Sequence, residues 1–124
     1  MDATFKIFDA IDKADAYALA EYFNNDIEVR DYRSATKMFN GSKEAILFFE
    51  AFFIEYKRRT DKVLIFCRFI DEYGCSPMHT DKFQDFSANH DFIIYMKSGE
   101  IEKIDVFPSL SHSMRFFVKD FDAV

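Results

Sequence analysis

The segment from Ser42 to Arg59 constrains the fold more than any other part of the chain. Its apolar residues recur at helical spacing, and Glu44 near its start and Lys57 near its end suit the two ends of a helix dipole. The apolar side chains nevertheless occupy most of its circumference: Ala45, Ile46, Leu47, Phe48, Phe49, Phe52, Phe53, Ile54 and Tyr56. Such a helix must be covered on more than one side, so we expect a sheet against it, together with other helices or a second subunit.

The second half of the chain has the composition and alternation typical of β-strands. Lys62 to Tyr73 is apolar on both faces, which predicts a central strand. Residues Asn89 to Lys97 and Glu100 to Phe107 predict a hairpin that turns at Ser98 and Gly99. Gly74 to Pro77 predicts a turn between strands, because glycine and proline both interrupt regular structure.

Shorter elements precede the long helix. Thr4 to Asp12 and Asp15 to Phe23 have helical spacing, with Asp15 placed to cap the second helix. A strand is expected from Ile27 to Tyr32, and a short one near Lys37 to Phe39. Because no repeat, low-complexity stretch or linker divides the chain, we expect one domain over residues 1–124.

Composition narrows the classes of partner and compartment. The net charge of -6 and the pI near 5.0 argue against nucleic acid or an anionic membrane surface as partner. No apolar run is long enough to span a bilayer, and the N-terminus lacks the pattern of a signal peptide. Cys67 and Cys75 lack CxxC spacing, so we expect a reduced, cytoplasmic protein and a buried structural thiol at Cys67.

Asp31 stands out because strand alternation predicts it on an apolar face. In an extended strand, Ile27, Val29 and Asp31 point to the same side. A carboxylate on the inward face is unfavourable unless it is hydrogen-bonded, paired or open to a cavity. Asp31 is therefore the first candidate for a functional group, the alternative being a frayed strand end that reaches solvent.

A second carboxylate follows the same logic. Asp91 shares a strand face with the apolar Ile93 and Tyr95. The 17 phenylalanines exceed what closing a small core requires. The excess could line a pocket or a subunit interface, or it could fill an unusually aromatic core.

The order of these elements resembles that of the nuclear-transport-factor-2-like superfamily, which includes SnoaL-like proteins and ketosteroid isomerases. The resemblance covers about Phe5 to Phe107 and is carried by Tyr22–Asp31, Gly41–Ile46 with Phe48 and Phe49 behind it, and Asp91–Ile101. It implies an α+β fold, in which a cone-shaped, curved antiparallel sheet wraps around a long helix beside N-terminal helices (a cystatin-like α+β roll). The superfamily includes enzymes, ligand binders and interaction modules, so function must be argued from the site.

Matched to the ketosteroid isomerase pattern, Asp31 falls on the general base and Asp91 on or near the protonated acid that stabilises the enolate. The resemblance thus implies proton abstraction next to a carbonyl, with a second carboxyl donating to the oxyanion. The oxyanion tyrosine of that family falls on Ile7, which cannot donate a hydrogen bond.

A histidine offers a second chemistry. Some dehydratases of the superfamily pair an aspartate with a histidine, which here implies Asp31 with His79 or His90. By strand parity His90 points away from Asp91, so His79 is the better candidate, and a structural or surface role is the alternative for either. No residues have metal-ligand spacing, and the glycines are too few and scattered for a phosphate loop, so we expect neither metal nor cofactor.

Two functions of different classes follow from this pattern. The first is a cofactor-independent isomerase, dehydratase or cyclase acting on an apolar carbonyl- or hydroxyl-bearing small molecule. The second is a non-catalytic ligand-binding or protein-interaction domain of the same fold. In either case we expect a homodimer paired through the outer sheet face and a conical pocket lined by Val29, Phe49, Phe52, Tyr56, Ile93 and Tyr95.

Overall fold

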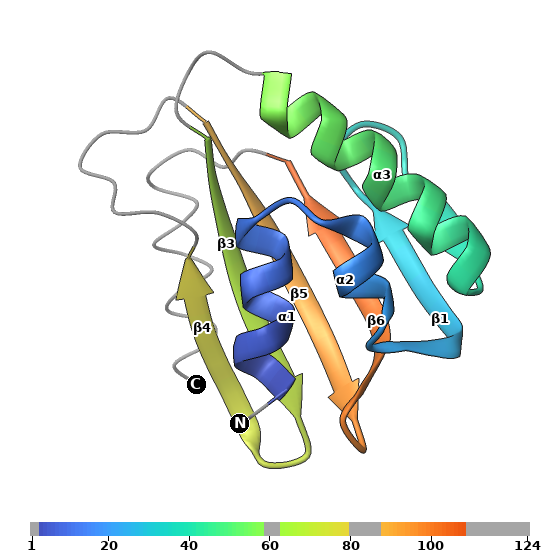
Figure 1. Ribbon diagram of the computed structural model, residues 1–124, viewed down its shortest axis with the longest axis vertical. Coiled ribbons are helices and arrows are strands. Elements are labelled where there is room, and N and C mark those ends of the chain that lie inside the picture. The colour runs from blue at the N-terminus through green and yellow to red at the C-terminus, as the bar shows by residue number, and fades with distance from the viewer. Residues whose placement is uncertain (1–2, 59–62, 80–87, 109–124) are drawn as a thin grey trace.

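The computed structural model describes residues 3–58, 63–79 and 88–108. Over these ranges the chain forms α1 (Ala3–Asp12), α2 (Ala16–Ala20), β1 (Phe23–Asp31), β2 (Lys37–Asn40), α3 (Ser42–Arg58), β3 (Val63–Asp71), β4 (Gly74–His79), β5 (Ala88–Lys97) and β6 (Glu100–Phe107). The predicted α+β class with N-terminal helices is confirmed (Figure 1).

The strands within the described ranges form one six-stranded sheet in the order β2-β1-β6-β5-β3-β4. The pairs β1–β2, β3–β4 and β5–β6 are antiparallel, as the hairpin pattern predicts, whereas β1–β6 and β3–β5 are parallel. The sheet is therefore mixed and not antiparallel throughout. The reason is topological: β4 turns back along the outer edge of β3, so β5 pairs with the other edge of β3 and runs in the same direction.

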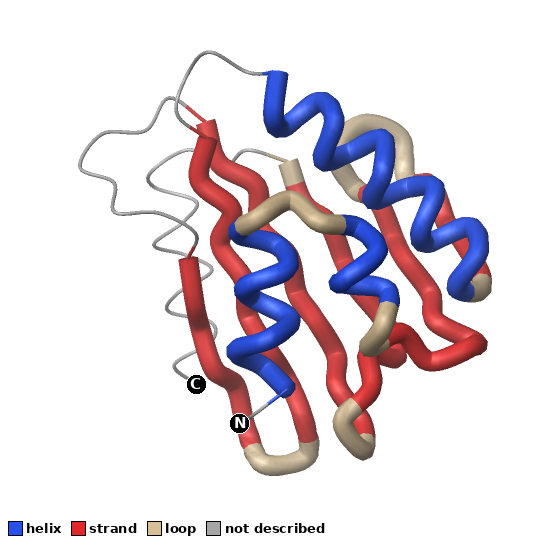
Figure 2. The backbone as a smooth tube through the Cα atoms, viewed as in Figure 1, coloured by secondary structure: helices blue, strands red, loops and turns tan. Residues whose placement is uncertain are grey.

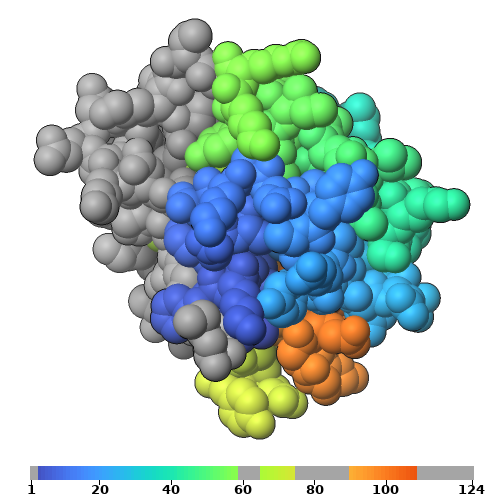
Figure 3. Space-filling model, in the orientation of Figure 1, coloured from blue at the N-terminus to red at the C-terminus, as the bar shows by residue number. Residues whose placement is uncertain are grey.

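All three helices of the described chain lie on one face of the sheet (Figures 1 and 2). The long helix α3 packs over β1 and β2, α1 lies over β3, and α2 lies between them against α3. Figure 3 shows this side of the molecule, where the helices cover the strands and the β3–β4 and β5–β6 turns project at one end. We call this the helix face, and we call the opposite side, which carries none of the helices in the described ranges, the helix-free face.

Phenylalanine rings join α3 to the sheet. Phe49 is fully buried, and its ring centroid lies 5.9 Å from that of Phe92 on β5, while Phe52 lies 5.2 Å from the same ring. Phe48 contacts Phe49 edge-on at 4.9 Å. Edge-to-face packing of this kind adds to the free energy gained by burying each ring. These residues of α3 therefore form the centre of the core. For them, the alternative that the phenylalanines fill an aromatic core is the one that holds.

Local sequence rules explain most element ends. The Asp15 carboxylate accepts a hydrogen bond from the Ala18 amide at 3.1 Å, so the predicted cap of α2 is confirmed. Ser98 and Gly99 both have positive φ, which matches the twist of a two-residue hairpin turn.

The predicted turn at Gly74 to Pro77 is wrong, because these residues belong to β4. The chain turns at residues 72–73, before β4 begins. There the Asp71 carboxylate accepts hydrogen bonds from the amides of Tyr73 (2.7 Å) and Gly74 (3.0 Å). Pro77 is tolerated because β4 is an edge strand of the sheet that the described residues form, with β3 as its neighbour there. The segment 80–87 and the tail beyond residue 108 lie outside the described residues.

We expect Phe49→Ala to lower the free energy of unfolding by about 3–5 kcal/mol, because it leaves a cavity at the helix–sheet contact. The measurement is urea denaturation followed by far-ultraviolet circular dichroism. Phe5→Ala is the control: Phe5 is 56% exposed on α1, and its loss should change stability by about 0.5 kcal/mol or less. Equal losses in the two variants would contradict a core centred on α3.

Candidate functional site

The two predicted catalytic carboxylates lie on opposite faces of the sheet. Asp31 pairs in register with Val106 and Val106 with Phe92, so these three residues share a face. It is the helix face, because the Phe92 ring packs on Phe49. Asp91 is the neighbour of Phe92 along the strand and points to the helix-free face. The prediction that both carboxylates line one cavity is therefore wrong. Alternation shows which residues of one strand share a face, but only the register between strands shows whether residues of two strands share a face.

The predicted pocket lining is divided in the same way. Val29, Phe49, Phe52 and Tyr56 lie on the helix side, whereas Ile93 and Tyr95 share the face of Asp91. The sheet itself separates the two groups, so these residues do not enclose one pocket.

The positions of the two histidines also differ from the prediction. His79 lies on the edge strand β4 opposite Phe66, and strands β3, β5 and β6 separate β4 from the strand of Asp31. The His90 ring instead lies 5.3 Å from the Phe52 ring on the helix face. His90 therefore lies on the side of the sheet that carries Asp31.

Asp31 is buried and held by Arg33. Its side chain accepts hydrogen bonds from Arg33 Nε (2.9 Å) and Nη2 (3.1 Å), one on each carboxylate oxygen, and a third from the Arg33 amide (3.0 Å). Asp31 is 6% exposed. A two-pronged guanidinium pair of this kind offsets much of the free energy lost when a carboxylate leaves water. The inward carboxylate predicted from alternation is thus present, and pairing stabilises it.

The guanidinium of Arg33 also lies over two aromatic rings of α3. Its central carbon is 4.9 Å from the Phe52 ring centroid and 5.5 Å from that of Phe48. Cations at these distances are attracted by the negative face of the ring. Arg33 therefore links the end of β1 to α3. Sequence reasoning missed it because Arg33 follows the strand, where alternation no longer predicts direction.

An open groove of about 540 Å³ runs beside this arginine, between α3 and β2. We call it the α3–β2 groove. Its lining combines one stripe of α3, with helical spacing, and two residues from the β1–β2 region: Glu44, Leu47, Phe48, Ala51, Phe52 and Glu55, with Arg33 and Phe39. Leu47 is 62% exposed although it is aliphatic. The groove thus has an apolar floor with a carboxylate near each end of the helical stripe.

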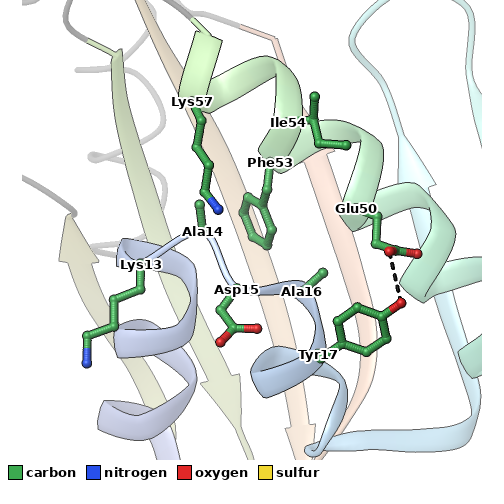
Figure 4. A pocket seen from close by; sticks show the side chains of 9 residues that line it. All are labelled: Lys13, Ala14, Asp15, Ala16, Tyr17, Glu50, Phe53, Ile54 and Lys57. Carbon is green, nitrogen blue, oxygen red and sulfur yellow. Dashed lines mark hydrogen bonds between the residues drawn. The ribbon is translucent and has the colours of Figure 1, made fainter.

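A second hollow, of about 320 Å³, lies where α1, α2 and α3 meet (Figure 4). Lys13 and Lys57 flank it, and the Tyr17 hydroxyl donates to Glu50 at 2.9 Å across its rim. Three of its charged groups have local partners: Lys13 pairs with Asp9 at 2.9 Å, Glu50 accepts from Tyr17, and Asp15 caps α2. We therefore place the candidate site in the α3–β2 groove.

The helix-free face holds a second concentration of charge. Asp105 is 6% exposed, lies in register with Arg30 and Ile93, and accepts a hydrogen bond from the Tyr95 hydroxyl at 3.3 Å. Burial raises the pKa of the Asp105 carboxyl, and attraction to Lys103 and Arg30 opposes that rise only in part. Sequence reasoning did not select Asp105, although it shares a strand face with Lys103 and Phe107.

Asp91 and Arg68 form a separate buried pair on the same face. Their side-chain atoms Oδ1 and Nη1 are 3.7 Å apart, and both residues are almost fully buried.

Cys67, the neighbour of Arg68 along β3, points to the opposite face and is also buried. Burial raises the pKa of its thiol. A thiol in that state is a poor nucleophile, in agreement with the predicted structural role.

Two further properties concern the described part of the chain. There, no group of three or more histidine, cysteine or acidic side chains has the arrangement of a metal site. None of the helices in the same ranges is long and apolar enough to cross a bilayer.

Comparison with known proteins identifies the fold. No family model and no curated protein sequence matches the chain. Among solved structures, an NTF2-like protein of unknown function from Cytophaga hutchinsonii is similar with a TM-score of 0.54 at 11% identity, covering 92% of this chain and 91% of that one. One from Pseudomonas putida has a TM-score of 0.50 at 12% identity, covering 90% and 85%. A domain with a cystatin-like fold from Nostoc punctiforme has a TM-score of 0.50 at 15% identity, covering 98% and 82%.

We expect Arg33→Gln to lower the free energy of unfolding by about 1–2 kcal/mol, because Asp31 loses its charged partner while Arg33 itself is partly screened by solvent. In urea denaturation, adding Asp31→Asn to that variant should recover part of the loss, with a coupling energy of about 1 kcal/mol. Arg58→Gln, at an exposed position in the last turn of α3, is the control and should change stability by about 0.5 kcal/mol or less. Additive effects at Asp31 and Arg33 would show that the pair contributes nothing.

Asp105 should make stability depend on pH in a defined direction. Since its pKa is raised in the folded state, the folded protein holds this proton more tightly, and stability falls as pH rises from the ordinary carboxyl pKa through the raised one. Asp105→Asn should therefore gain stability relative to the parent protein as pH rises from 4 to 7, as measured by urea denaturation. The neighbouring charged and titratable groups, Glu28, Arg30, Tyr95 and Lys103, remain in both proteins. Glu102→Gln, an exposed change in the same strand, should show no such trend, and a trend of the opposite sign in Asp105→Asn would refute the assignment.

Proposed function

Because the chain has the nuclear-transport-factor-2-like fold, we propose that it is a non-catalytic domain that binds an apolar small molecule in the α3–β2 groove. The observation that carries this proposal is the groove itself, in which Leu47, Ala51 and Phe39 line an accessible floor beside the Asp31–Arg33 ion pair. Its volume of about 540 Å³ falls in the range of small-molecule sites.

The arrangement of acids supports binding over acid–base catalysis. A general base must reach the substrate proton, yet Asp31 is 6% exposed and both of its oxygens accept hydrogen bonds from Arg33, so a substrate would first have to displace that guanidinium. The second carboxyl of the isomerase pattern, Asp91, is on the other face and beside Arg68. The oxyanion tyrosine position holds Ile7, which is fully buried in α1. The parts of the isomerase mechanism are therefore not gathered around one substrate position.

The lining favours an elongated apolar ligand. The helical stripe repeats Leu47, Ala51 and Glu55 along the helix, and the rings of Phe39 and Phe48 lie 4.9 Å apart beside it. Burying an alkyl chain or a flat ring on this floor removes apolar area from water at about 25 cal/mol per Å².

The proposal predicts that 1-octanol shifts backbone amide signals of the groove in two-dimensional ¹H–¹⁵N NMR spectra. Leu47→Gln should weaken its binding about fivefold, equivalent to about 1 kcal/mol, because it makes the exposed floor polar. Ile54→Gln is the matched control: Ile54 is also aliphatic, half-exposed and on α3, but it lies outside the groove. Its affinity for 1-octanol should equal that of the parent protein.

Two kinds of result would contradict the proposal. One comes from the binding experiment: either 1-octanol does not bind, or Leu47→Gln and Ile54→Gln weaken its binding equally. The other is catalysis: if the protein exchanges the α-protons of cyclohexanone with deuterated water, and Asp31→Asn abolishes the exchange, then Asp31 acts as a base and the domain is an enzyme.

A further inference from the structure

We infer that the ligand of the α3–β2 groove carries a cationic head group, a substituted ammonium or guanidinium, and that Arg33 occupies the head-group position in its absence. This inference rests on the proposed binding function and names the class of ligand. It comes from the surroundings of one side chain, the guanidinium of Arg33.

Three groups surround that guanidinium. The Asp31 carboxylate takes two of its hydrogen bonds, and the rings of Phe48 and Phe52 face it at 5.5 and 4.9 Å. A carboxylate with aromatic faces is the combination that recognises organic cations in protein sites. The chain thus contains a site suited to an organic cation, and the guanidinium of its own Arg33 occupies that site.

The charges along the groove favour a cation over an anion. Asp31 already neutralises Arg33, and the remaining charged residues of the lining are Glu44 and Glu55. An anionic head group would meet these carboxylates and would also have to draw Arg33 away from Asp31. Once Arg33 has moved aside, a cationic head group is attracted by the Asp31 carboxylate and by the two glutamates.

Arg33 can leave without unfolding its loop. A third of its side chain is exposed, so the guanidinium can rotate into water. The loop keeps a separate anchor, since the Arg33 amide donates to Asp31 Oδ1 independently of the guanidinium. A tethered competitor of this kind acts at an effective concentration of roughly millimolar, so it lowers ligand affinity without blocking the site.

The test compares three probes with the same alkyl tail: octyltrimethylammonium, 1-octanol and octanoate, each titrated below its micelle concentration and followed by ¹H–¹⁵N NMR. In the parent protein the cation should bind about tenfold more tightly than 1-octanol, and octanoate more weakly than either. The Arg33 Nε–H signal should shift with the cation only, because only the cation displaces the guanidinium from Asp31. This readout requires no mutation.

Variants test the displacement. Arg33→Gln should bind the cation about tenfold more tightly than the parent protein, because the internal competitor is gone. Adding Asp31→Asn to it should reverse that gain. Glu55→Gln, an exposed change at one end of the groove, should weaken cation binding, whereas Glu102→Gln, outside the groove, should alter the binding of neither the cation nor 1-octanol.

The outcomes separate this inference from the proposed function. If 1-octanol binds in the groove and the cation binds no better, or if octanoate binds best, the cationic ligand is refuted and the binding function stands. If the Arg33 Nε–H signal stays fixed while the cation binds, displacement is refuted. If none of the three probes shifts groove signals, the binding function and this inference both fall.

Discussion

The packing of α3 against the sheet is the contact on which the rest of the structure depends. Its phenylalanines meet Phe92 on β5, and α2 covers a second side of the helix. A helix that is apolar around most of its circumference needs cover on every side, yet β2 is only four residues long. The stripe that includes Leu47 and Ala51 is therefore left partly open. Within the described part of the chain, the groove is thus a direct consequence of a helix with more apolar surface than the neighbouring elements cover.

The buried carboxylates are divided between the two faces of the sheet. On the helix face, Asp31 is close to the apolar core and is stabilised by Arg33. On the helix-free face, Asp91 lies near Arg68, and Asp105 accepts a hydrogen bond from Tyr95. Burying a carboxylate is unfavourable unless such partners are present, which explains why each has one. The same division keeps the two predicted acids apart, and it is the physical reason for proposing binding over acid–base catalysis.

Much of the fold could be predicted because it follows from local rules. Periodicity located the long helix, the Asp15 carboxylate marked the start of α2, and Ser98 with Gly99 marked the last hairpin. The prediction failed at Gly74 to Pro77, where glycine and proline suggested a turn within what is strand β4. Position in the sheet decided that case, because an edge strand accepts a proline that a central strand would not.

For the candidate site, the sequence by itself determined that Asp31 points to an apolar face and needs compensation, since alternation is a property of a single strand. Tertiary structure decided what compensates it. Arg33 lies beyond the strand end, and only the approach of α3 places Phe48 and Phe52 beneath its guanidinium. Tertiary structure also decided that Asp91 belongs to the other face, because the relation between two strands depends on the register of every pair between them. Interactions within one element follow from sequence spacing, whereas a site assembled from several elements follows from their packing.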